Sequence, residues 1–316
     1  MKNILIAGGA GFIGSHLCDL LVSNNKVICV DNLITGSKNN IEHLLSNPNF
    51  KYIECDISEP DFLDKIKVKN LDEIYNLASP ASPVDYLQHS IDTLKVGSVG
   101  VFNLLELARS FGAKILVAST SEVYGDPLEH PQKEEYWGNV NPVGIRSCYD
   151  EAKRFMEALS VAYNRTHAVN IRIARIFNTY GPRMRLNDGR VVPNFISQAL
   201  KGEALSIYGN GKQTRSFCYV SDLIDGLTKL MASEVNIPVN IGNPEEKTIL
   251  EFADAVIKII GSDLKFNYHD IPQDDPKKRK PDITKARKFL AWEPKIALED
   301  GLSQTIEYFR KEINEA

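Results

Sequence analysis

The chain has 316 residues, 43% of them hydrophobic and 25% charged, with a formal net charge of −4. This composition is typical of a globular enzyme and excludes a disordered or fibrous chain, and its slight acidity argues against a general affinity for nucleic acid or anionic membranes. Because one hydrophobic core rarely serves so many residues, we expect two joined lobes, a larger one over residues 1–180 and a smaller one over 181–316, with some later segments returning to the first.

The first predicted unit is a strand, a glycine turn and a helix. Residues 2–7 (KNILIA) form a short apolar run of strand type, Gly8, Gly11 and Gly14 follow, and apolar residues recur at helical spacing over 15–22. Glycines at G-x-x-G-x-x-G spacing keep the turn tight and let backbone amides at the start of the helix approach a pyrophosphate. The unit therefore predicts a dinucleotide-binding turn.

The next strand supports the same interpretation. Residues 26–30 (KVICV) form a second buried strand that ends on Asp31, close to the place expected for a carboxylate that binds the hydroxyls of an adenosine ribose. An acid there disfavours a 2′-phosphate, so we expect NAD as the cofactor rather than NADP. The alternative is a carboxylate in an ordinary loop.

Strands and helices continue to alternate through the first lobe. We expect strands over 51–55, 73–77, 114–118 and 170–176, and helices over 91–111 and 149–163. This rhythm predicts an α/β fold, a Rossmann-type doubly wound parallel sheet with helices on both faces and a smaller C-terminal substrate-binding lobe. After residue 181 the alternation loosens and turn residues gather, as in 209–211 and 272–276.

The candidate reacting groups lie in two short segments. Active residues belong at the carboxyl ends of parallel strands, and the row Ser119 to Glu122 follows the strand 114–118 directly. Tyr149 and Lys153 are four residues apart, so on a helix they share a face and the ammonium can stabilise a phenolate, lowering the tyrosine pKa from about 10. Such a tyrosine can take the proton of an alcohol while hydride leaves the same carbon. The alternative is an exposed helix face.

The remaining patterns add few constraints. The five cysteines show no C-x-x-C pair and the six histidines are scattered, so we expect reduced structural thiols and no metal. The apolar run after Met1 is too short for a signal peptide and no run of about 18 apolar residues occurs, so we expect a cytoplasmic protein without a membrane span. The basic run at 277–280 is a solvated loop, an import patch, or a site for phosphate or carboxylate groups.

Over nearly its whole length the chain resembles the extended short-chain dehydrogenases/reductases, and within them the UDP-glucuronate decarboxylases, also called UDP-xylose synthases. The glycine turn and the Tyr149/Lys153 pair mark only the superfamily. The segments that carry the resemblance are GGAGFIGSHL (8–17), NLASPASP (76–83), ASTSEVYGDP (118–127), CYDEAKR (148–154), RIFNTYGPRM (175–184), NDGRVVPNF (187–195), YGNGKQTRSFCYVSD (208–222) and RKPDI (279–283). Among them SPASP (79–83), TSE (120–122) and RKPDI are much more selective than the first two marks. The resemblance implies an NAD-dependent enzyme that acts on a nucleotide sugar.

The Thr120-Ser121-Glu122 segment distinguishes related chemistries. Sugar-nucleotide 4,6-dehydratases carry Thr-Asp-Glu at the resembling place, where an acid and a base eliminate water together, whereas Ser121 leaves one carboxylate here. The 4-epimerases of the group usually carry small residues, because their ketosugar must turn between two faces. A Ser-Glu pair with Arg279 opposite instead implies a site that holds a substrate carboxylate, and therefore a uronic acid.

The resemblance implies a mechanism for UDP-glucuronate. Tyr149, with its pKa lowered by Lys153 and the nicotinamide charge, deprotonates the C4 hydroxyl while NAD takes the hydride, and Thr120 shares the hydrogen bonding. The β-keto acid loses carbon dioxide to an enolate held by the same donors. Glu122, with a raised pKa, or a water that it orients, protonates C5, and the returned hydride gives UDP-xylose. Arg279 anchors the substrate carboxylate and pyrophosphate.

The resemblance also implies three sets of site residues. The catalytic set is Tyr149, Lys153, Glu122, Thr120, Ser121 and Arg279. The NAD set is Gly8, Gly11, Phe12, Ile13, Gly14, Asp31, Asn32, Thr35, Gly36, Asp56, Ile57, Leu77, Ala78 and Lys153. The substrate set is Pro80 and Ser82, Asn178 on the diphosphate, Arg215 and Arg279 as cationic clamps, and Val192, Asn194 and Tyr208 around the uridine. The alternative for Tyr208 and Asn194 is loop stabilisation.

Some features leave alternatives open. The family usually has Asn where this chain has Gly97, which puts any relay through that side chain in doubt. The helices over 91–111 and 150–163 are amphipathic, and the resemblance implies a homodimer that pairs them in a four-helix bundle, although burial within one chain gives the same pattern. A UDP-glucuronate epimerase and a non-catalytic NAD-sensing or scaffold protein are the other two functions that we consider.

Overall fold

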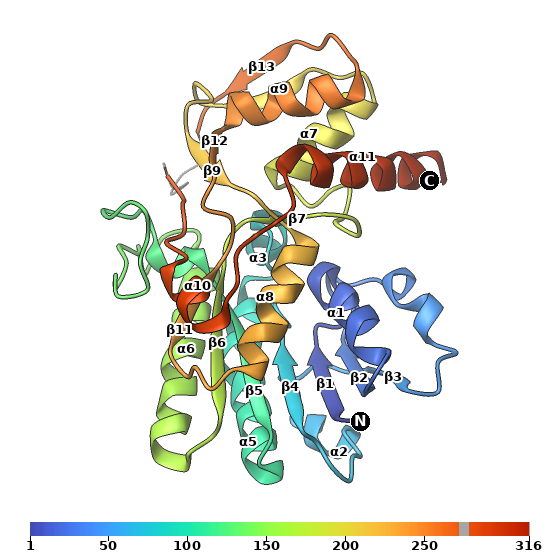
Figure 1. The fold of residues 1–316 in the computed structure, drawn as a ribbon, viewed down its shortest axis with the longest axis vertical. Coiled ribbons are helices and arrows are strands. Elements are labelled where there is room, and N and C mark those ends of the chain that lie inside the picture. Colours follow the sequence, from blue (N-terminus) through green and yellow to red (C-terminus); the bar gives the residue numbers. More distant parts are fainter. Residues whose placement is uncertain (272–277, 316) are drawn as a thin grey trace.

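The computed structural model describes residues 1–271 and 278–315, and it places a main sheet below a smaller lobe (Figure 1). Seven parallel strands of the described residues form the main sheet, in the order β11-β6-β5-β4-β1-β2-β3. Their bounds are β1 Asn3–Ala7, β2 Lys26–Asp31, β3 Phe50–Glu54, β4 Glu73–Asn76, β5 Lys114–Thr120, β6 Ile171–Ile176 and β11 Pro238–Ile241. The order reverses direction on either side of β1, which confirms the predicted doubly wound parallel sheet.

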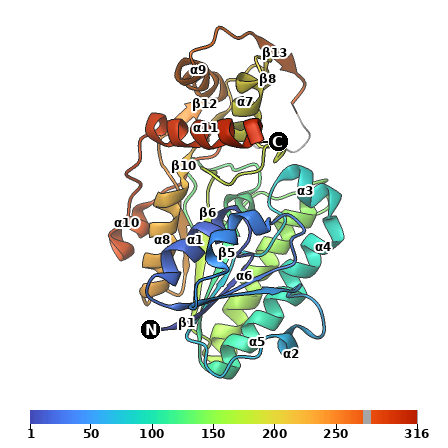
Figure 2. The same ribbon diagram turned by 90° about the vertical axis from the view of Figure 1, so that its right-hand side faces the viewer.

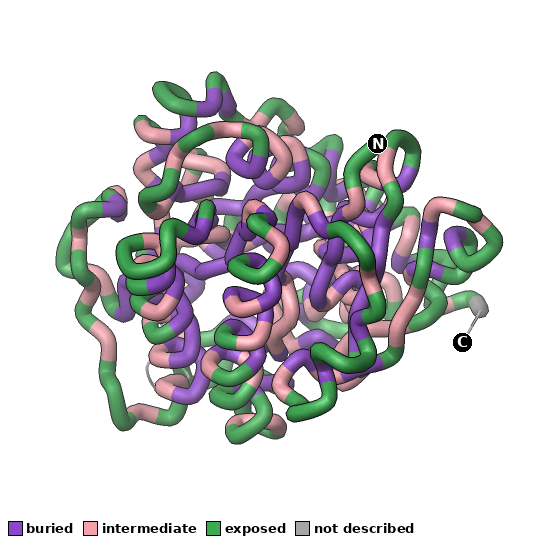
Figure 3. The backbone as a smooth tube through the Cα atoms, turned by 90° about the horizontal axis from the view of Figure 1, so that it is seen from below, coloured by how far each residue is buried: buried purple, intermediate pink, exposed green. Residues whose placement is uncertain are grey.

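Helices cover both faces of this sheet (Figure 2). One face carries α1 (Phe12–Val22), α8 (Val220–Ala232) and α10 (Thr284–Leu290), and the other carries α2 (Phe62–Lys65), α5 (Val101–Phe111) and α6 (Ser147–His167). Successive residues of β1 alternate between the two resulting cores, since Ile4 and Ile6 pack on the first side and Leu5 and Ala7 on the second. Figure 3 shows these buried segments running through the middle of the molecule.

The smaller lobe lies beyond the carboxyl ends of the strands (Figure 1). It contains α7 (Val191–Leu200), α9 (Ile249–Ile260), α11 (Leu298–Glu315), and short strands β8 (Leu205–Tyr208), β9 (Thr214–Ser216), β12 (Glu246–Thr248) and β13 (Phe266–His269). The pair β7 (Thr179–Tyr180) and β10 (Cys218–Tyr219) links it to the sheet. Strand β11 and helices α8 and α10 come after residue 181 yet lie with the main sheet. The division of the chain into two lobes between residues 180 and 181 stays a prediction.

The observed elements match the predicted ones closely, with four larger differences. Helix α1 starts three residues before the predicted boundary, α6 runs from Ser147 to His167 rather than over 149–163, and β5 continues two residues further, to Thr120. The predicted helix over 91–111 is α4 (Ser90–Lys95), a wider π-helical turn η3 (Val96–Gly100) and α5. The predicted turn at 272–276 and the first residue of the basic run, Lys277, lie outside the described residues.

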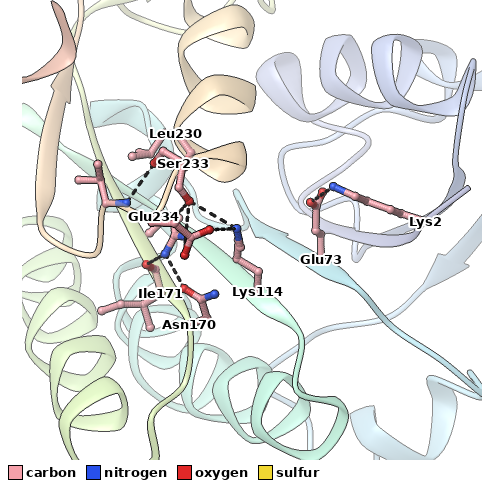
Figure 4. A network of polar contacts seen from close by, with 10 residues as sticks. Lys2, Glu73, Lys114, Asn170, Ile171, Leu230, Ser233 and Glu234 are labelled. Carbon is pink, nitrogen blue, oxygen red and sulfur yellow. Dashed lines mark hydrogen bonds and ion pairs between the residues drawn. The ribbon is translucent and has the colours of Figure 1, made fainter. Parts of the chain in front are cut away.

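The amino ends of the strands are closed by polar contacts. The fully buried Arg172 guanidinium donates to the Ser233 carbonyl just after α8, with Nε at 2.9 Å, and to Asn170 Oδ1 at 2.6 Å. Lys114 Nζ lies 3.2 Å from Glu234 Oε1, and Figure 4 shows Lys114, Asn170 and Glu234 together at this place. These contacts satisfy the backbone carbonyl of Ser233 at the end of α8. In the described residues no helix is long and apolar enough to cross a membrane.

Candidate active site

A cavity of about 490 Å³ lies along the carboxyl edge of the main sheet. Its wall takes residues from the turn after β1, from the ends of β2, β4, β5 and β6, and from α6, α7 and β8. Parallel sheets place ligand sites at this edge, where the strand order reverses. The cavity therefore joins the predicted dinucleotide turn to the predicted reacting groups.

The glycine turn leaves room for an anion at the start of α1. Gly8 has φ +77°, and a Cβ on it would lie 2.8 Å from the backbone of Leu77 and Ala78. A Cβ on Gly14 would lie 2.1 Å from the Gly8 carbonyl oxygen. No side chain caps α1 and its first turn holds no acid, so the first amides face the cavity without competition. This geometry fits the pyrophosphate of a dinucleotide.

Asp31 ends β2 at the wall of the same cavity. Its Oδ2 accepts from the Ala10 amide at 2.9 Å and its Oδ1 from the Leu33 amide at 2.8 Å, and burial raises its pKa. Each oxygen keeps a lone pair for a ribose hydroxyl. A Cβ on Gly36 would lie 2.9 Å from Asp31 Oδ1, so Gly36 makes room for the carboxylate rather than lining the cavity.

The structure brings the other residues of the predicted NAD set to the cavity wall. They are Gly8, Gly11, Phe12, Ile13, Gly14, Asp31, Asn32, Thr35, Asp56, Ile57, Leu77, Ala78 and Lys153. Asn32 Nδ2 also donates to Asp56 Oδ2 at 2.7 Å, which fixes the two side chains on each other. The residues therefore fit NAD by position and by donor type.

Tyr149 and Lys153 lie on the cavity side of α6, at the end of β5. The Tyr149 ring stacks on Tyr86, with ring centres 5.0 Å apart and planes 13° apart. Lys153 Nζ lies 5.6 Å from the centre of the Tyr149 ring and donates to the Ala118 carbonyl at 2.8 Å. The helix thus carries a phenol and an ammonium into one site, as the spacing predicts.

The expected lowering of the Tyr149 pKa is not produced by the protein alone. Burial raises this pKa to about 12, against the opposing effects of a hydrogen bond with Thr120 and the charge of Arg190. Burial also lowers the pKa of Lys153 to about 8, because removal from water destabilises the charged ammonium. The prediction is corrected: the enclosed site favours the neutral phenol until further positive charge arrives.

Glu122 lies in the short turn η4 (Ser121–Tyr124) that follows β5, and two guanidinium groups hold it. Its Oε2 accepts from Arg146 Nη2 at 2.7 Å and from Arg279 Nη2 at 3.1 Å. Burial alone would raise the Glu122 pKa, but the charges of Arg279 and Arg146 outweigh it and hold that pKa below its usual range. The expected raised pKa is therefore wrong for the protein without substrate, because the sequence did not reveal Arg146.

Arg279 lies behind Glu122, and it is not one of the residues at the cavity wall. It is 1% exposed, and its Nη1 donates to the Ser121 carbonyl at 2.8 Å. The expected direct anchoring of substrate by Arg279 is corrected accordingly: its described contacts act through Ser121 and Glu122. Of the two guanidinium groups that hold Glu122, Arg146 is the one at the cavity wall. It lies in the loop directly before α6, and no sequence pattern marks it.

The substrate half of the wall is rich in guanidinium groups. It contains every other member of the predicted substrate set, namely Pro80, Ser82, Asn178, Val192, Asn194, Tyr208 and Arg215. It also contains Arg185 and Arg190, which the sequence reasoning missed. Arg185 pairs with Asp85, and Arg190 Nη2 pairs with Asp188 Oδ2 at 2.7 Å. Asn194 donates to the Gly189 carbonyl at 3.0 Å, so it stabilises a loop as well as facing the cavity.

Comparison with known proteins places the chain in a family. The family model described as GDP-mannose 4,6 dehydratase matches residues 5–305. UDP-glucuronic acid decarboxylase 1 of Xenopus tropicalis is 54% identical over 313 residues, 99% of this chain and 73% of the relative. UDP-glucuronic acid decarboxylase 5 of Arabidopsis thaliana is 54% identical over 310 residues, 98% of this chain and 89% of the relative. The chain belongs to the UDP-glucuronic acid decarboxylase family.

A solved structure supports the same grouping. The crystal structure of UDP-glucuronic acid 4-epimerase from Bacillus cereus in complex with UDP-glucuronic acid and NAD aligns with a TM-score of 0.89. It is 31% identical, and the alignment covers 98% of this chain and 99% of that one. That solved relative, which has the same fold as this chain, holds NAD together with UDP-glucuronic acid.

Proposed function

We propose that this protein decarboxylates UDP-glucuronate to UDP-xylose, with NAD regenerated in every cycle. The observation that carries the proposal is the Ser121-Glu122 turn at the end of β5, where a single carboxylate is held by guanidinium groups beside Tyr149. The 54% identity to UDP-glucuronic acid decarboxylases supports it. An elimination would need a second acid at the place of Ser121, and a uronic acid substrate supplies its own carboxylate.

NAD would be held by the glycine turn through its pyrophosphate and by Asp31 through its adenosine ribose. When bound, NAD would supply the hydride acceptor and donor for C4 of the sugar, and its positive ring would favour the phenolate of Tyr149. The lining of the cavity by thirteen residues of the predicted NAD set supports this assignment.

Tyr149 and Thr120 would handle the C4 oxygen. Tyr149 takes the hydroxyl proton as C4 becomes a ketone. The Glu122 amide donates to Thr120 Oγ1 at 3.2 Å, which leaves the hydroxyl proton of Thr120 to point elsewhere, toward the phenol or the substrate. When the C5–C6 bond breaks, its electron pair moves to the C4 oxygen as an enolate, and these two donors stabilise it.

Glu122 would then take up a proton from solvent and deliver it to C5 in place of the departed carboxylate, directly or through water. In the protein without substrate this carboxylate is ionised, because Arg146 and Arg279 hold it. A substrate carboxylate that reaches Arg146 shares its charge and adds a negative group beside Glu122, and both effects raise the Glu122 pKa. Substrate binding thus prepares the proton donor.

The second candidate is UDP-glucuronate 4-epimerisation, favoured by the alignment with the Bacillus cereus epimerase. Proton NMR of UDP-glucuronate incubated with the protein and NAD separates the two reactions. We expect the spectrum of a UDP-pentose with two protons on C5, accompanied by release of carbon dioxide. A hexuronate inverted at C4 would instead establish the epimerase, and unchanged substrate would favour a non-catalytic protein.

We also propose that two copies pair through α4, η3, α5 and α6. Apolar side chains on these elements face outward, among them Ile91, Leu94, Val99, Phe102 and Phe155. Phe102 of α5 lies edge-on to Tyr163 of α6 with ring centres 6.0 Å apart, so the two helices contact each other beside these exposed apolar side chains. The cytoplasmic location stays a prediction.

A further inference from the structure

Asp150 is a buried carboxyl group with an unsatisfied oxygen, next to the reacting phenol. It follows Tyr149 on α6, it is 6% exposed, and it is not one of the residues at the cavity wall. Its Oδ1 is buried and has no hydrogen-bond partner among the described residues. Buried carboxyl groups are normally paired, so the unpaired oxygen of Asp150 needs a functional explanation.

The charges around Asp150 are those of the Glu122 site. Glu122 of η4, Arg146 before α6, Arg279 after β13 and Glu151 on its own helix all act on the Asp150 pKa, and the charge of Asp150 in turn raises the pKa of Tyr149 and of Tyr86 of α3 (Pro83–Gln88). The Asp150 amide donates to the Arg146 carbonyl at 3.2 Å, which places the two residues one helical turn apart. Arg146 and Arg279 both donate to Glu122 Oε2. The same two guanidinium charges therefore act on both carboxyl groups, one from the cavity wall and one from behind it.

We infer that Asp150 is a positioning residue for the decarboxylation: its carboxyl group competes with Glu122 for Arg146 and Arg279, and so governs how readily Glu122 gains a proton. The inference rests on the function proposed above. Asp150 has no place at the cavity wall, so it acts through the guanidinium groups and not on the substrate. The negative charge of an ionised Asp150 partly offsets the positive charge of the guanidinium groups, so they stabilise the ionised form of Glu122 less.

This competition depends on pH. Burial, followed by the charge of Glu122, raises the Asp150 pKa to about 7. Above this pH an ionised Asp150 raises the Glu122 pKa and helps the proton transfer to C5, and below it a neutral Asp150 leaves Glu122 to the two guanidinium groups. Asparagine has the shape and the charge of the neutral carboxyl group, so Asp150→Asn should behave like the wild type at low pH.

The first test compares kcat of the wild type and Asp150→Asn from pH 6 to pH 8.5. We expect similar kcat near pH 6, a several-fold lower kcat for the variant above about pH 7.5, and little change in KM. The control is Glu307→Gln, which removes an exposed charge on α11, where Glu307 Oε1 pairs with Lys311 Nζ at 3.0 Å. Its kcat relative to the wild type should not vary with pH. If kcat of Asp150→Asn relative to the wild type is equally independent of pH, the inference is overturned.

A second test needs no turnover. The Asp150 pKa is raised in the folded protein, so its neutral form adds stability at low pH that is lost as the pH rises from about 4 to about 7. Asparagine does not titrate. The difference in Tm between Asp150→Asn and the wild type should therefore shift in favour of the variant by a few degrees between pH 5 and pH 8. A constant difference overturns the inference.

The two tests separate failure of the inference from failure of the proposed function. If the wild type leaves UDP-glucuronate unchanged, the proposed function fails, and a widening Tm difference still shows that Asp150 titrates as a buried group in the folded protein, while the stability profile of Glu122→Gln tests its coupling to Glu122. If Asp150→Asn does not fold, Glu122→Gln carries the test, because loss of the Glu122 charge lowers the Asp150 pKa and moves the pH-dependent loss of stability to lower pH. An unmoved stability profile in that variant contradicts the coupling.

Discussion

At the scale of single residues, the site depends on how Glu122 is charged. Two guanidinium groups hold it ionised, one facing the cavity and one buried behind it. Each of these partners stabilises the ionised carboxylate, so the loss of either one weakens the hold on that form and lets the Glu122 pKa rise. Glu122 is therefore ionised in the resting protein and protonated in the proposed working state, and the substrate carboxylate that reaches Arg146 makes the difference.

Replacement of Glu122 by glutamine should stop turnover and leave NAD binding intact. The amide cannot deliver a proton to C5, and general acid–base groups contribute about 10²- to 10⁴-fold. We expect kcat for UDP-glucuronate to fall by at least about 10²-fold, with the NAD dissociation constant unchanged in calorimetry. Glu307→Gln serves as the control, and near-normal turnover of Glu122→Gln would remove the proton-transfer role.

Some of these residues could be predicted from sequence and some could not. Tyr149, Lys153, Thr120 and Glu122 lie in contiguous motifs with a known spacing, and all four reach the cavity wall. Arg146 and Asp150 act through partners far away in the sequence, so no local pattern reports them. The direction of the Glu122 and Tyr149 pKa shifts also depends on burial, which only the folded structure supplies.

At the scale of elements, the glycine turn decides whether α1 can receive a pyrophosphate. A Cβ on Gly14 would meet the Gly8 carbonyl oxygen at 2.1 Å, which neither backbone can accommodate without moving. This close approach between the glycine turn and the first turn of α1 is the physical reason for the G-x-x-G-x-x-G spacing, and such a spacing can be recognised in a sequence. That the turn binds NAD stays a prediction.

Gly14→Ala should weaken NAD binding by at least about tenfold, since overpacking of this kind costs about 1–3 kcal/mol. Isothermal titration with NAD measures the effect. The control is Gly112→Ala at the end of α5, where the added Cβ meets nothing within 4 Å although φ is +65°. That variant should lose some stability and keep its NAD affinity. Unchanged affinity of Gly14→Ala would contradict the proposed pyrophosphate site.

The π-helical turn η3 shows what the sequence could not predict about an element. The pattern over 91–111 predicted one regular helix, and the structure widens it where Gly97 meets α6. A Cβ on Gly97 would lie 2.6 Å from the Ala152 Cβ, directly before Lys153. Gly97 therefore lets the helix approach α6 closely, so this chain has close packing at the place where the family's asparagine would offer a side-chain relay.

Gly97→Ala should push α6 away and disturb Lys153. We expect a loss of about 1–3 kcal/mol in the free energy of unfolding and a parallel fall in kcat. Ser98→Ala, on the same turn, removes only a hydroxyl that donates to the Leu94 carbonyl at 2.6 Å, and it should change stability by less than about 0.5 kcal/mol. Denaturant unfolding compares the two. Equal stabilities would show that η3 adjusts freely.

At the scale of the whole molecule, the parallel sheet and the smaller lobe enclose one cavity between them. The order and direction of the strands follow from alternating strand and helix signals, so this half of the fold could be predicted. The short strands β8, β9, β12 and β13 could not, because each has only three or four residues and pairs with a distant segment. Local pattern carries too little information for such pairs.

The outward apolar surface of α4, η3, α5 and α6 should make the protein a dimer. Phe102 is 47% exposed and Phe155 49% in the single chain, and their burial against a second copy would favour association. We expect light scattering to give the mass of a dimer for the wild type and of a monomer for Phe102→Asp. Leu128→Asp, at an exposed position outside these helices, should remain a dimer. A monomeric wild type would contradict the pairing.

The most direct test of the central claim follows the fate of C6. UDP-glucuronate labelled with carbon-13 at C6 is incubated with the protein and a small amount of NAD, and carbon dioxide and nucleotide sugars are quantified together. We predict labelled carbon dioxide in an amount equal to the UDP-xylose formed, many turnovers per NAD, and no release with Tyr149→Phe. Label that stays in a nucleotide sugar while the substrate is consumed would contradict the account.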